Sequence, residues 1–256
     1  MYYNTFKQLA NDHPMEPKEP IPIFIISHDR LKVLRESILS FKQIGTPYQV
    51  IIHDNNSTYR PTLEYLKSLE DKDNFTVVYN KTNDLNSVSV TIKTFMATSN
   101  CQYYVVSDPD IALFNVDADI LEVYQHFLDS NPRIIAAGPM LEIKDIPDYY
   151  PLKALAIQRH TDQFWHKEPV PYQWQGKEIH YQSAHIDTTF AMYRRSFTFK
   201  NYNIGVRLYQ PYSARHLDWY IDPDNMSADQ KYYLASASTV SHWGGGWLKS
   251  CVNKKE

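Results

Sequence analysis

The sequence predicts an α/β protein with a mostly parallel sheet flanked by helices. Short apolar segments of strand length alternate with segments of helical periodicity, and the connections between them are short. This alternation is typical of strands joined by crossover helices, which makes neighbouring strands parallel. Polar clusters also follow three of the apolar segments. In a parallel sheet these clusters meet outside the carboxyl ends of the strands, where α/β proteins bind their ligands.

The first half of the chain shows this alternation most clearly. The run "IPIFIIS" at 21–27 is continuously apolar, as expected for a strand that is covered on both faces. The next segment has Leu31, Leu34 and Ile38 at helical spacing, and Gly45 is a typical residue to end that helix. The predicted strands are 21–27, 48–57, 75–80 and 102–110, with predicted helices at 28–45, 60–72 and 87–100 between them.

The second half is less regular. A helix is predicted over 118–132 and a strand over 133–141, whereas residues 142–185 are aromatic, rich in His and Pro, and show little periodicity. A strand followed by a basic turn is expected within 185–197. We expect residues 1–20 to form an arm or linker and residues 21–256 to form a single domain, with halves at 21–115 and 116–256.

Composition narrows the classes of function. The formal net charge is −3, so no general basic field is available to hold nucleic acid. The first residues lack the features of a signal peptide, and no apolar stretch reaches the roughly 20 residues that span a bilayer. Cys101 and Cys251 form no Cys-x-x-Cys motif, as in proteins of a reduced compartment. We therefore expect a cytoplasmic protein without a transmembrane segment, and peripheral contact with a membrane is compatible with this expectation.

The segment "YYVVSDPDIALF" at 103–114 places two carboxylates directly after a predicted buried strand. In an extended chain Asp108 and Asp110 point the same way, and Pro109 favours that conformation for the residue before it. Adjacent carboxylates repel each other unless a cation neutralises them. Oxygen ligands suit Mg²⁺ or Mn²⁺, and Mg²⁺ in particular is often bound together with substrate phosphates. The alternative is an ordinary turn, because Asp and Pro are common turn residues.

Three motifs, taken in order, resemble those of the GT-A glycosyltransferases, and family 2 most of all. They are Ser-His-Asp-Arg at 27–30, Asp-Asn-Asn-Ser at 54–57 and Asp-Pro-Asp at 108–110, the last in the place of the family's D-x-D motif. The resemblance covers about 21–115 closely and continues more loosely to about 247. It implies a GT-A fold, with a Rossmann-like, mostly parallel sheet flanked by helices and an aromatic-rich region on the acceptor side.

The resemblance also implies a nucleotide-diphosphate sugar as donor, with uracil as the usual base, and Mn²⁺ or Mg²⁺ as cofactor. Asp54 would receive the base, because a carboxylate accepts the imide N–H of uracil. Arg30 would pair with a phosphate or with Asp54. The late sequence "TVSHWGGG" would supply a histidine beside glycines that allow close approach of the backbone. The implied nucleotide-sugar site consists of Ser27, His28, Arg30, Asp54, Asn55, Ser57 and Asp108, and the implied metal ligands are Asp108, Asp110 and His242.

Inverting members of the family use a general base to deprotonate the acceptor hydroxyl. By its position the resemblance implies Asp218 in "ARHLDWY", although His216 and Leu217 stand where acidic residues are common. Asp187 in "HIDTTFAMYRR" is the rival. Both carboxylates have structural alternatives: Asp218 as a helix cap, and Asp187 as the ion-pair partner of an arginine at 194–195.

We expect the acceptor to be a hydroxyl group on a glycan, a lipid-linked sugar or a protein. The aromatic side chains of 142–185 either stack on sugar rings or form core. Two other functions stay open: a GT-A-like module that binds glycans or partners without turnover, and a sugar nucleotidyltransferase. The latter needs a Gly-rich triphosphate loop, and no glycine lies between Pro20 and Gly45. The aromatic residues in question are Tyr149, Tyr150, Trp165, Tyr172 and Trp174.

Overall fold

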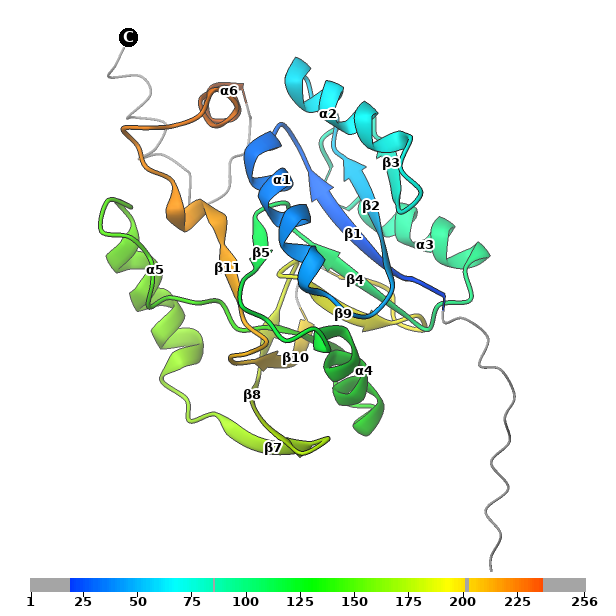
Figure 1. The fold of residues 1–256 in the computed structure, drawn as a ribbon, viewed down its shortest axis with the longest axis vertical. Helices are drawn as coiled ribbons and strands as arrows, with labels where there is room; N and C mark the ends of the chain where they lie inside the picture. Colours follow the sequence, from blue (N-terminus) through cyan, green and yellow to red (C-terminus); the bar gives the residue numbers. More distant parts are fainter. Residues whose placement is uncertain (1–18, 85, 201–202, 237–256) are drawn as a thin grey trace, which may run out of the picture.

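The computed structural model describes residues 19–84, 86–200 and 203–236, which contain one large sheet with helices packed against it (Figure 1). Its nine strands lie in the order β3-β2-β1-β4-β9-β6-β10-β8-β7. Within this sheet β8 and β9 run against the direction that the other strands share, so the prediction of a mostly parallel sheet is confirmed. The strands are β1 (Ile21–Ser27), β2 (Tyr48–Asp54), β3 (Phe75–Tyr79), β4 (Tyr103–Ser107), β6 (Ala136–Pro139), β7 (Val170–Trp174), β8 (Lys177–Ile186), β9 (Ala191–Arg194) and β10 (Asn203–Leu208).

The sheet is buried on both faces around β1. Ile23 and Ile25 belong to one core cluster, and Phe24 and Ile26 belong to a second one, because successive side chains of a strand point to opposite faces. Helices α1, α2 and α4 contribute to the first cluster and α3 contributes to the second. The predicted helices are confirmed and are shorter than predicted, at both ends except for α2, which begins at the predicted residue: α1 (Leu31–Ser40), α2 (Arg60–Glu70), α3 (Val88–Thr98) and α4 (Ile120–Ser130).

The region 142–185 contains more regular structure than its sequence pattern indicates. It forms α5 (Lys153–His160), a π-helical turn at Thr161–Trp165, and the hairpin of β7 and β8. Gln175 and Gly176 have φ values of 49° and 77° and make the two-residue turn of this hairpin. β8 has few apolar residues, and it is a strand because β7 and β10 pair with it on either side.

A separate two-stranded ladder brings distant segments together at the carboxyl edge of β4. The chain leaves the main sheet after β4 and forms β5 (Ile111–Leu113), which pairs antiparallel with β11 (Ala214–His216). Ile111 lies opposite His216 in this ladder. The backbone N–H of Leu217 donates to the carbonyl of Asp110 at 2.7 Å. A 3₁₀ turn at Leu217–Tyr220 and helix α6 (Ala228–Ser236) follow.

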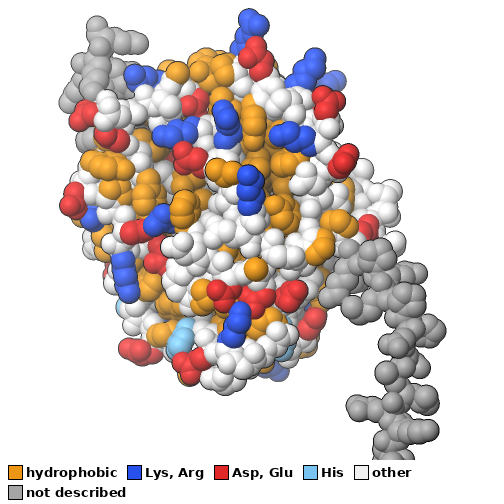
Figure 2. Space-filling view, viewed as in Figure 1, with side chains coloured by type: hydrophobic (Ala, Val, Ile, Leu, Met, Phe, Trp, Pro, Cys, Tyr) orange, Lys and Arg blue, Asp and Glu red, His pale blue; other side chains and the backbone are white. Residues whose placement is uncertain are grey.

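The surface shows no broad area of one charge on the face drawn in Figure 2, where basic and acidic side chains are interspersed. Within the described ranges, no helix combines the length and the apolar character that a membrane crossing requires.

Candidate functional site

The structure brings the three polar motifs together at the carboxyl edge of the sheet, as the parallel arrangement predicts. β1 and β2 are paired in register from Ile21 to Ser27, so that Ser27 lies opposite Asp54. The backbone N–H of Asn55 donates to the carbonyl of Ser27 at 2.7 Å. β4 pairs with the other side of β1. The ends of three neighbouring strands therefore carry the residues that the sequence singles out.

The centre of the site is a buried group of one arginine, one histidine and two aspartates. Nη2 of Arg30 donates to Oδ2 of Asp110 at 3.2 Å and also to Oδ1 of Asp218. Nδ1 of His216 lies 3.9 Å from Oδ2 of Asp110. The His216 ring stacks on Trp219, with 5.1 Å between the ring centroids. Arg30 thus pairs with these two carboxylates, and the prediction that it pairs with Asp54 is wrong.

Burial and mutual proximity shift the proton affinities of this group. Burial raises the pKa of Asp110; His216 and Arg30 act in the opposite direction, and Asp218 adds to the rise. For Arg30, burial lowers the pKa, but Asp218 and Asp110 outweigh it and raise the pKa above its usual value. The guanidinium group is therefore charged at every pH at which the protein is folded, and it compensates the buried carboxylates.

Asp110, His216 and Asp218 fit a divalent metal ion. One ligand atom from each lies within 4.8 Å of the others. Oδ1 of Asp110 and Nδ1 of His216 are buried and have no hydrogen-bond partner among the described residues, although such atoms are normally paired. Two carboxylates with an imidazole suit Mn²⁺ better than Mg²⁺, which prefers oxygen ligands.

This group differs from the ligand set that the resemblance implies. His216 and Asp218 were not predicted as ligands, because nothing in the sequence shows that β11 pairs with β5. Asp108 stands outside the group, and His242 lies outside the described residues. Asp-Pro-Asp forms a turn into β5, and Oδ2 of Asp108 accepts a hydrogen bond from Oγ1 of Thr188 at 2.5 Å. Burial, and then the charge of Asp110, raise the pKa of Asp108 well above its ordinary value.

The loop after β2 is held by a network around Asp54. Both carboxylate oxygens of Asp54 accept from Ser57: Oδ1 from the hydroxyl at 2.5 Å and Oδ2 from the backbone N–H at 3.1 Å. Burial raises the pKa of Asp54, although the bonds from Ser57 lower it. The Ser57 hydroxyl also accepts from the backbone N–H of Asp29 at 2.8 Å. Ser57 therefore joins the loops that follow β1 and β2.

Asp29 and His53 are two residues of this region that the sequence analysis missed. Asp29 has a φ of 51° and is fully buried. Its Oδ1 accepts from the backbone N–H groups of Thr58 and Tyr59, both at 2.8 Å, just before α2 begins. His53 bonds to Ser87, Thr91 and Asn80. The signal for them was local, because Asp29 lies within the 27–30 motif and His53 directly precedes the 54–57 motif.

The remaining predicted residues of the nucleotide site line the same loops. Nδ1 of His28 lies 2.8 Å from the carbonyl oxygen of Asn55. The Asn55 side-chain oxygen accepts from Ser87 and Asn80, each at 3.3 Å. The Ser27 hydroxyl is buried and has no hydrogen-bond partner among the described residues. All the predicted nucleotide-site residues except Asp108 thus belong to the two adjoining segments 27–30 and 54–57, although the Arg30 side chain pairs with Asp110 and Asp218.

Helix α6 covers these loops, and no sequence signal indicated this. The Tyr233 ring lies under the guanidinium of Arg30, 4.7 Å from its carbon, and also contacts His28 edge-on. Tyr232 packs on Tyr59 with 4.8 Å between ring centroids. Asp229 accepts from the backbone N–H of Lys32 at 2.8 Å, in the first turn of α1.

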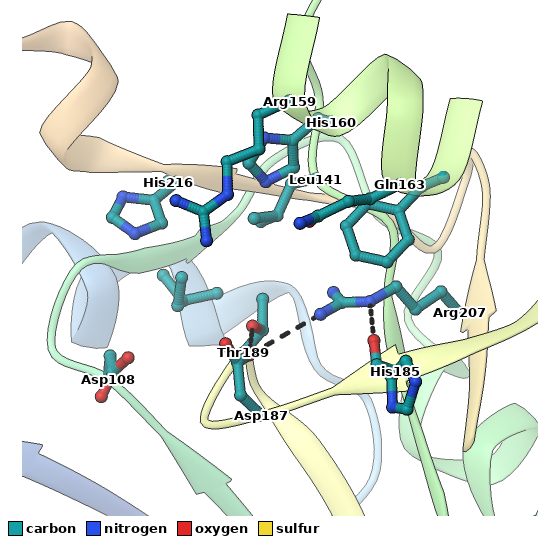
Figure 3. Close-up of a pocket in the computed structure, with 12 residues that line it drawn as sticks. Asp108, Leu141, Arg159, His160, Gln163, His185, Asp187, Thr189, Arg207 and His216 are labelled. Atoms are coloured by element: carbon teal, nitrogen blue, oxygen red, sulfur yellow. Dashed lines mark hydrogen bonds and ion pairs between the residues drawn. The ribbon is translucent and has the colours of Figure 1, made fainter. Parts of the chain in front are cut away.

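A pocket of about 160 Å³ opens beside this group, between the end of α5 and the segment after β8 (Figure 3). Asp187 lines the pocket and its side chain is 52% exposed, whereas the side chain of Asp218 is 2% exposed. Oγ1 of Thr189 donates to Asp187, and Nη2 of Arg207 lies 3.6 Å from it. The predicted alternative, an ion pair between Asp187 and an arginine at 194–195, is wrong because both of those arginines bind backbone carbonyls.

None of the aromatic residues proposed for the acceptor lines this pocket. Tyr150 is buried in the main core, and Trp165, Tyr172 and Trp174 pack against that core. Tyr149 is exposed at 52%. The aromatic side chain that does line the pocket is Phe164. Four of the five predicted residues therefore belong to the core, one of the two alternatives that the sequence left open.

Comparison with known proteins identifies relatives for the chain. A family model described as "Glycosyl transferase family 2" matches residues 23–199. No curated protein matches the chain significantly in sequence. The mannosyltransferase PcManGT from Pyrobaculum calidifontis, solved with GDP-Man and Mn²⁺, is 14% identical to this chain at a TM-score of 0.40. The match covers 51% of this chain and 38% of the PcManGT chain.

Residues 1–349 of TarS from S. aureus are 12% identical at a TM-score of 0.48, covering 92% of this chain and 71% of that one. The same TarS fragment, solved with UDP-GlcNAc, is 13% identical at a TM-score of 0.47 and covers 87% and 68% of the two chains.

Proposed function

The chain belongs to glycosyl transferase family 2, and from this premise we propose that it transfers a sugar from a nucleotide-diphosphate donor to a hydroxyl acceptor with the help of a divalent metal ion. The observation that carries the proposal is the buried group of Asp110, His216 and Asp218 at the carboxyl edge of the sheet. It lies beside the two loops in which the other polar motifs are gathered. A UDP-sugar as donor, Mn²⁺ as metal and inversion at the anomeric carbon are parts of the proposal.

In this proposal Asp110, His216 and Asp218 hold the metal ion. A bound metal would neutralise charge on the diphosphate of the leaving nucleotide. Arg30 then moves from the carboxylates to the phosphates, which a guanidinium binds through two parallel N–H groups. The loops at 27–30 and 54–57 receive the nucleoside, and the Ser57 bonds keep Asp54 oriented at their junction.

Two carboxylates compete for the role of general base. Asp187 is supported by its exposure in the pocket and because it is not one of the three residues of the metal group. Asp218 is supported by the family resemblance, but its carboxylate is buried against Arg30. We therefore propose Asp187 as the base and Asp218 as a metal ligand. The acceptor is a hydroxyl of a glycan, a lipid-linked sugar or a protein, and a cytoplasmic location completes the proposal.

The test is a thermal-shift panel of nucleotide sugars with and without Mn²⁺. A donor that binds the folded protein raises the melting temperature by mass action. We expect one class of donor, with Mn²⁺, to stabilise the wild type, and we expect Asp110→Asn to lose this response. Asp73→Asn, at an exposed position on the opposite edge of the sheet, is the matched control and should respond like the wild type.

Two variants then separate the roles of the carboxylates. Asp187→Asn should keep the donor response and lose sugar transfer, whereas Asp218→Asn should lose both. Absence of any donor response in the wild type would overturn the proposal. If the protein binds a donor but neither transfers its sugar nor hydrolyses it, the result would instead favour a glycan-binding module.

A further inference from the structure

We propose that the pocket beside Asp187 selects an acceptor that carries an anionic group, a phosphate or a carboxylate, and that Arg159 binds this group. The inference rests on the proposed function, because it assigns the acceptor side of the same site. It adds a substrate class and a specificity-determining residue that neither the family match nor the motifs provide.

The charges that line the pocket are the first argument. Two arginines, Arg159 and Arg207, and three histidines line it, against two carboxylates, Asp108 and Asp187. Asp187 is assigned to the acceptor hydroxyl in the proposed reaction, and Asp108 accepts a hydrogen bond from Thr188. The rest of the lining is cationic, protonatable or uncharged, in a chain whose formal net charge is −3. The histidines are His160, His185 and His216.

Arg207 forms the fixed part of this wall. Its Nε donates to the carbonyl of His185 at 2.8 Å and its Nη1 donates to the carbonyl of Pro139 at 2.9 Å. Its guanidinium carbon lies 4.8 Å from the centre of the Phe164 ring. Because its Nη2 also faces Asp187 at 3.6 Å, Arg207 offsets the charge of that carboxylate, and an anion in the pocket meets little net repulsion.

Arg159 forms the adaptable part. It stands in the last turn of α5 and its side chain extends toward the middle of the pocket, across from Asp187 and Thr189 (Figure 3). Arg159 is exposed, whereas the neighbouring His160 is buried. Burial lowers the pKa of His160 to about 4, so this histidine is neutral near pH 7 and Arg159 supplies the charge at this end of α5.

A second pocket continues the first and extends the same pattern. It has a volume of about 280 Å³ and shares Gln163, Phe164 and His185 with the first pocket. Lys167 also lines it, and no carboxylate is among its lining residues in the described structure. An acceptor longer than one sugar would thus run away from Asp187 along a surface that carries cations. A guanidinium binds phosphate or carboxylate through paired N–H groups, which an uncharged sugar cannot match.

The experiment measures binding of acceptor probes to the wild-type protein in the presence of Mn²⁺ and UDP. The probes are glucose, glucose 6-phosphate and glucuronate, so the two charged probes distinguish phosphate from carboxylate. We expect one charged probe to bind at least about tenfold tighter than glucose, and high salt to reduce that ratio. Arg159→Gln should remove the preference and Arg159→Lys should retain part of it. Arg133→Gln, an exposed arginine beyond the end of α4, should leave the preference unchanged.

Equal affinity for the three probes, no binding of either charged probe at millimolar concentration, or a preference that survives in Arg159→Gln would overturn the inference. These results are distinguishable from failure of the proposed function, because UDP with Mn²⁺ stabilises the wild type if the donor site is as proposed. If the protein binds UDP but neither charged sugar, the proposed function still stands and the proposal of an anionic acceptor is wrong.

Discussion

At the scale of single residues, the site is a balance of buried charges. Arg30 donates to both Asp110 and Asp218 from the first loop of the sheet. A buried carboxylate that loses its partner is destabilising, typically by about 3–5 kcal/mol for a broken buried pair. Arg30 therefore stabilises the metal-free protein and competes with a metal ion for the same oxygens.

This competition predicts the behaviour of Arg30→Gln. Without metal the variant should unfold more easily than the wild type, by about 3–5 kcal/mol in urea titrations. Added Mn²⁺ should raise its melting temperature by more than that of the wild type, because the ion no longer displaces a guanidinium. Arg35→Gln, an exposed position on α1, should behave like the wild type in both measurements. An equal response of Arg30→Gln and wild type to Mn²⁺ would contradict the competition.

His53 makes a prediction about pH. Burial lowers the pKa of His53 from its ordinary value of 6.5 to about 4. The His53 ring therefore takes up a proton more readily in the unfolded chain than in the folded protein. As a result, the contribution of His53 to stability falls as the pH falls from about 6.5 to about 4. The variant His53→Gln has no such proton to bind. Its deficit in unfolding free energy relative to the wild type should narrow by up to about 3 kcal/mol between pH 7 and pH 4. A deficit that is constant with pH would show that the neutral ring is not required.

The residues of the site were only partly predictable from the sequence. The motifs at 27–30, 54–57 and 108–110 could be located because each follows an apolar strand, and parallel strands align their carboxyl ends. His216 could not be assigned, since its approach to Asp110 depends on a pairing between β5 and β11 that no local pattern reveals. Asp29 and Tyr233 act through contacts with distant backbone and side chains, for which spacing along the chain carries no information.

At the scale of elements, two consecutive arginines, Arg194 at the end of β9 and Arg195 just after it, hold the ends of two helices. Arg194 donates to the carbonyls of Ile134 at 2.7 Å, Asn131 at 3.0 Å and Leu128, at and beyond the end of α4. The last carbonyls of a helix lack partners within the helix. A cation at this end also interacts favourably with the partial negative charge of the helix dipole. Arg195 makes the equivalent contact with Ser99, at the end of α3.

We expect Arg194→Ala to lower the unfolding free energy by about 1–3 kcal/mol, because it leaves carbonyls without donors. Urea unfolding measures this change, and Arg194→Lys should recover part of it. Arg133→Ala is the control, since Arg133 is exposed close to the same helix end. If the two alanine variants were equally stable, the arginine contacts would contribute no net stability.

The strands and helices themselves were predicted best where packing and local pattern agree. β1 is buried at every position, and a continuous apolar run predicts this directly. β8 was not predicted, because its polar residues are held as a strand by its neighbours β7 and β10. The Gln175-Gly176 turn, which joins β7 to β8, is the one local signal that could have located β8.

At the scale of the whole molecule, the sheet joins the two halves of the sequence. β9 lies between β4 and β6, so a strand from the second half pairs directly with one from the first. We therefore propose that the two halves form a single domain. All five tryptophans lie after residue 142, whereas far-ultraviolet dichroism reports on the entire chain. Urea unfolding followed by the two signals should give coincident curves. Two separated transitions would show that the halves unfold independently.

The ladder of β5 and β11 also determines when the metal group can exist during synthesis. Asp110 leaves the ribosome early, but His216 and Asp218 follow it by roughly 100 residues, which takes several seconds at about 5–20 residues per second. Until then a nascent chain carries one carboxylate of the group and the Arg30 that pairs with it. If Asp110, His216 and Asp218 hold a metal ion as proposed, the complete ligand group forms only after Asp218 has emerged from the ribosome.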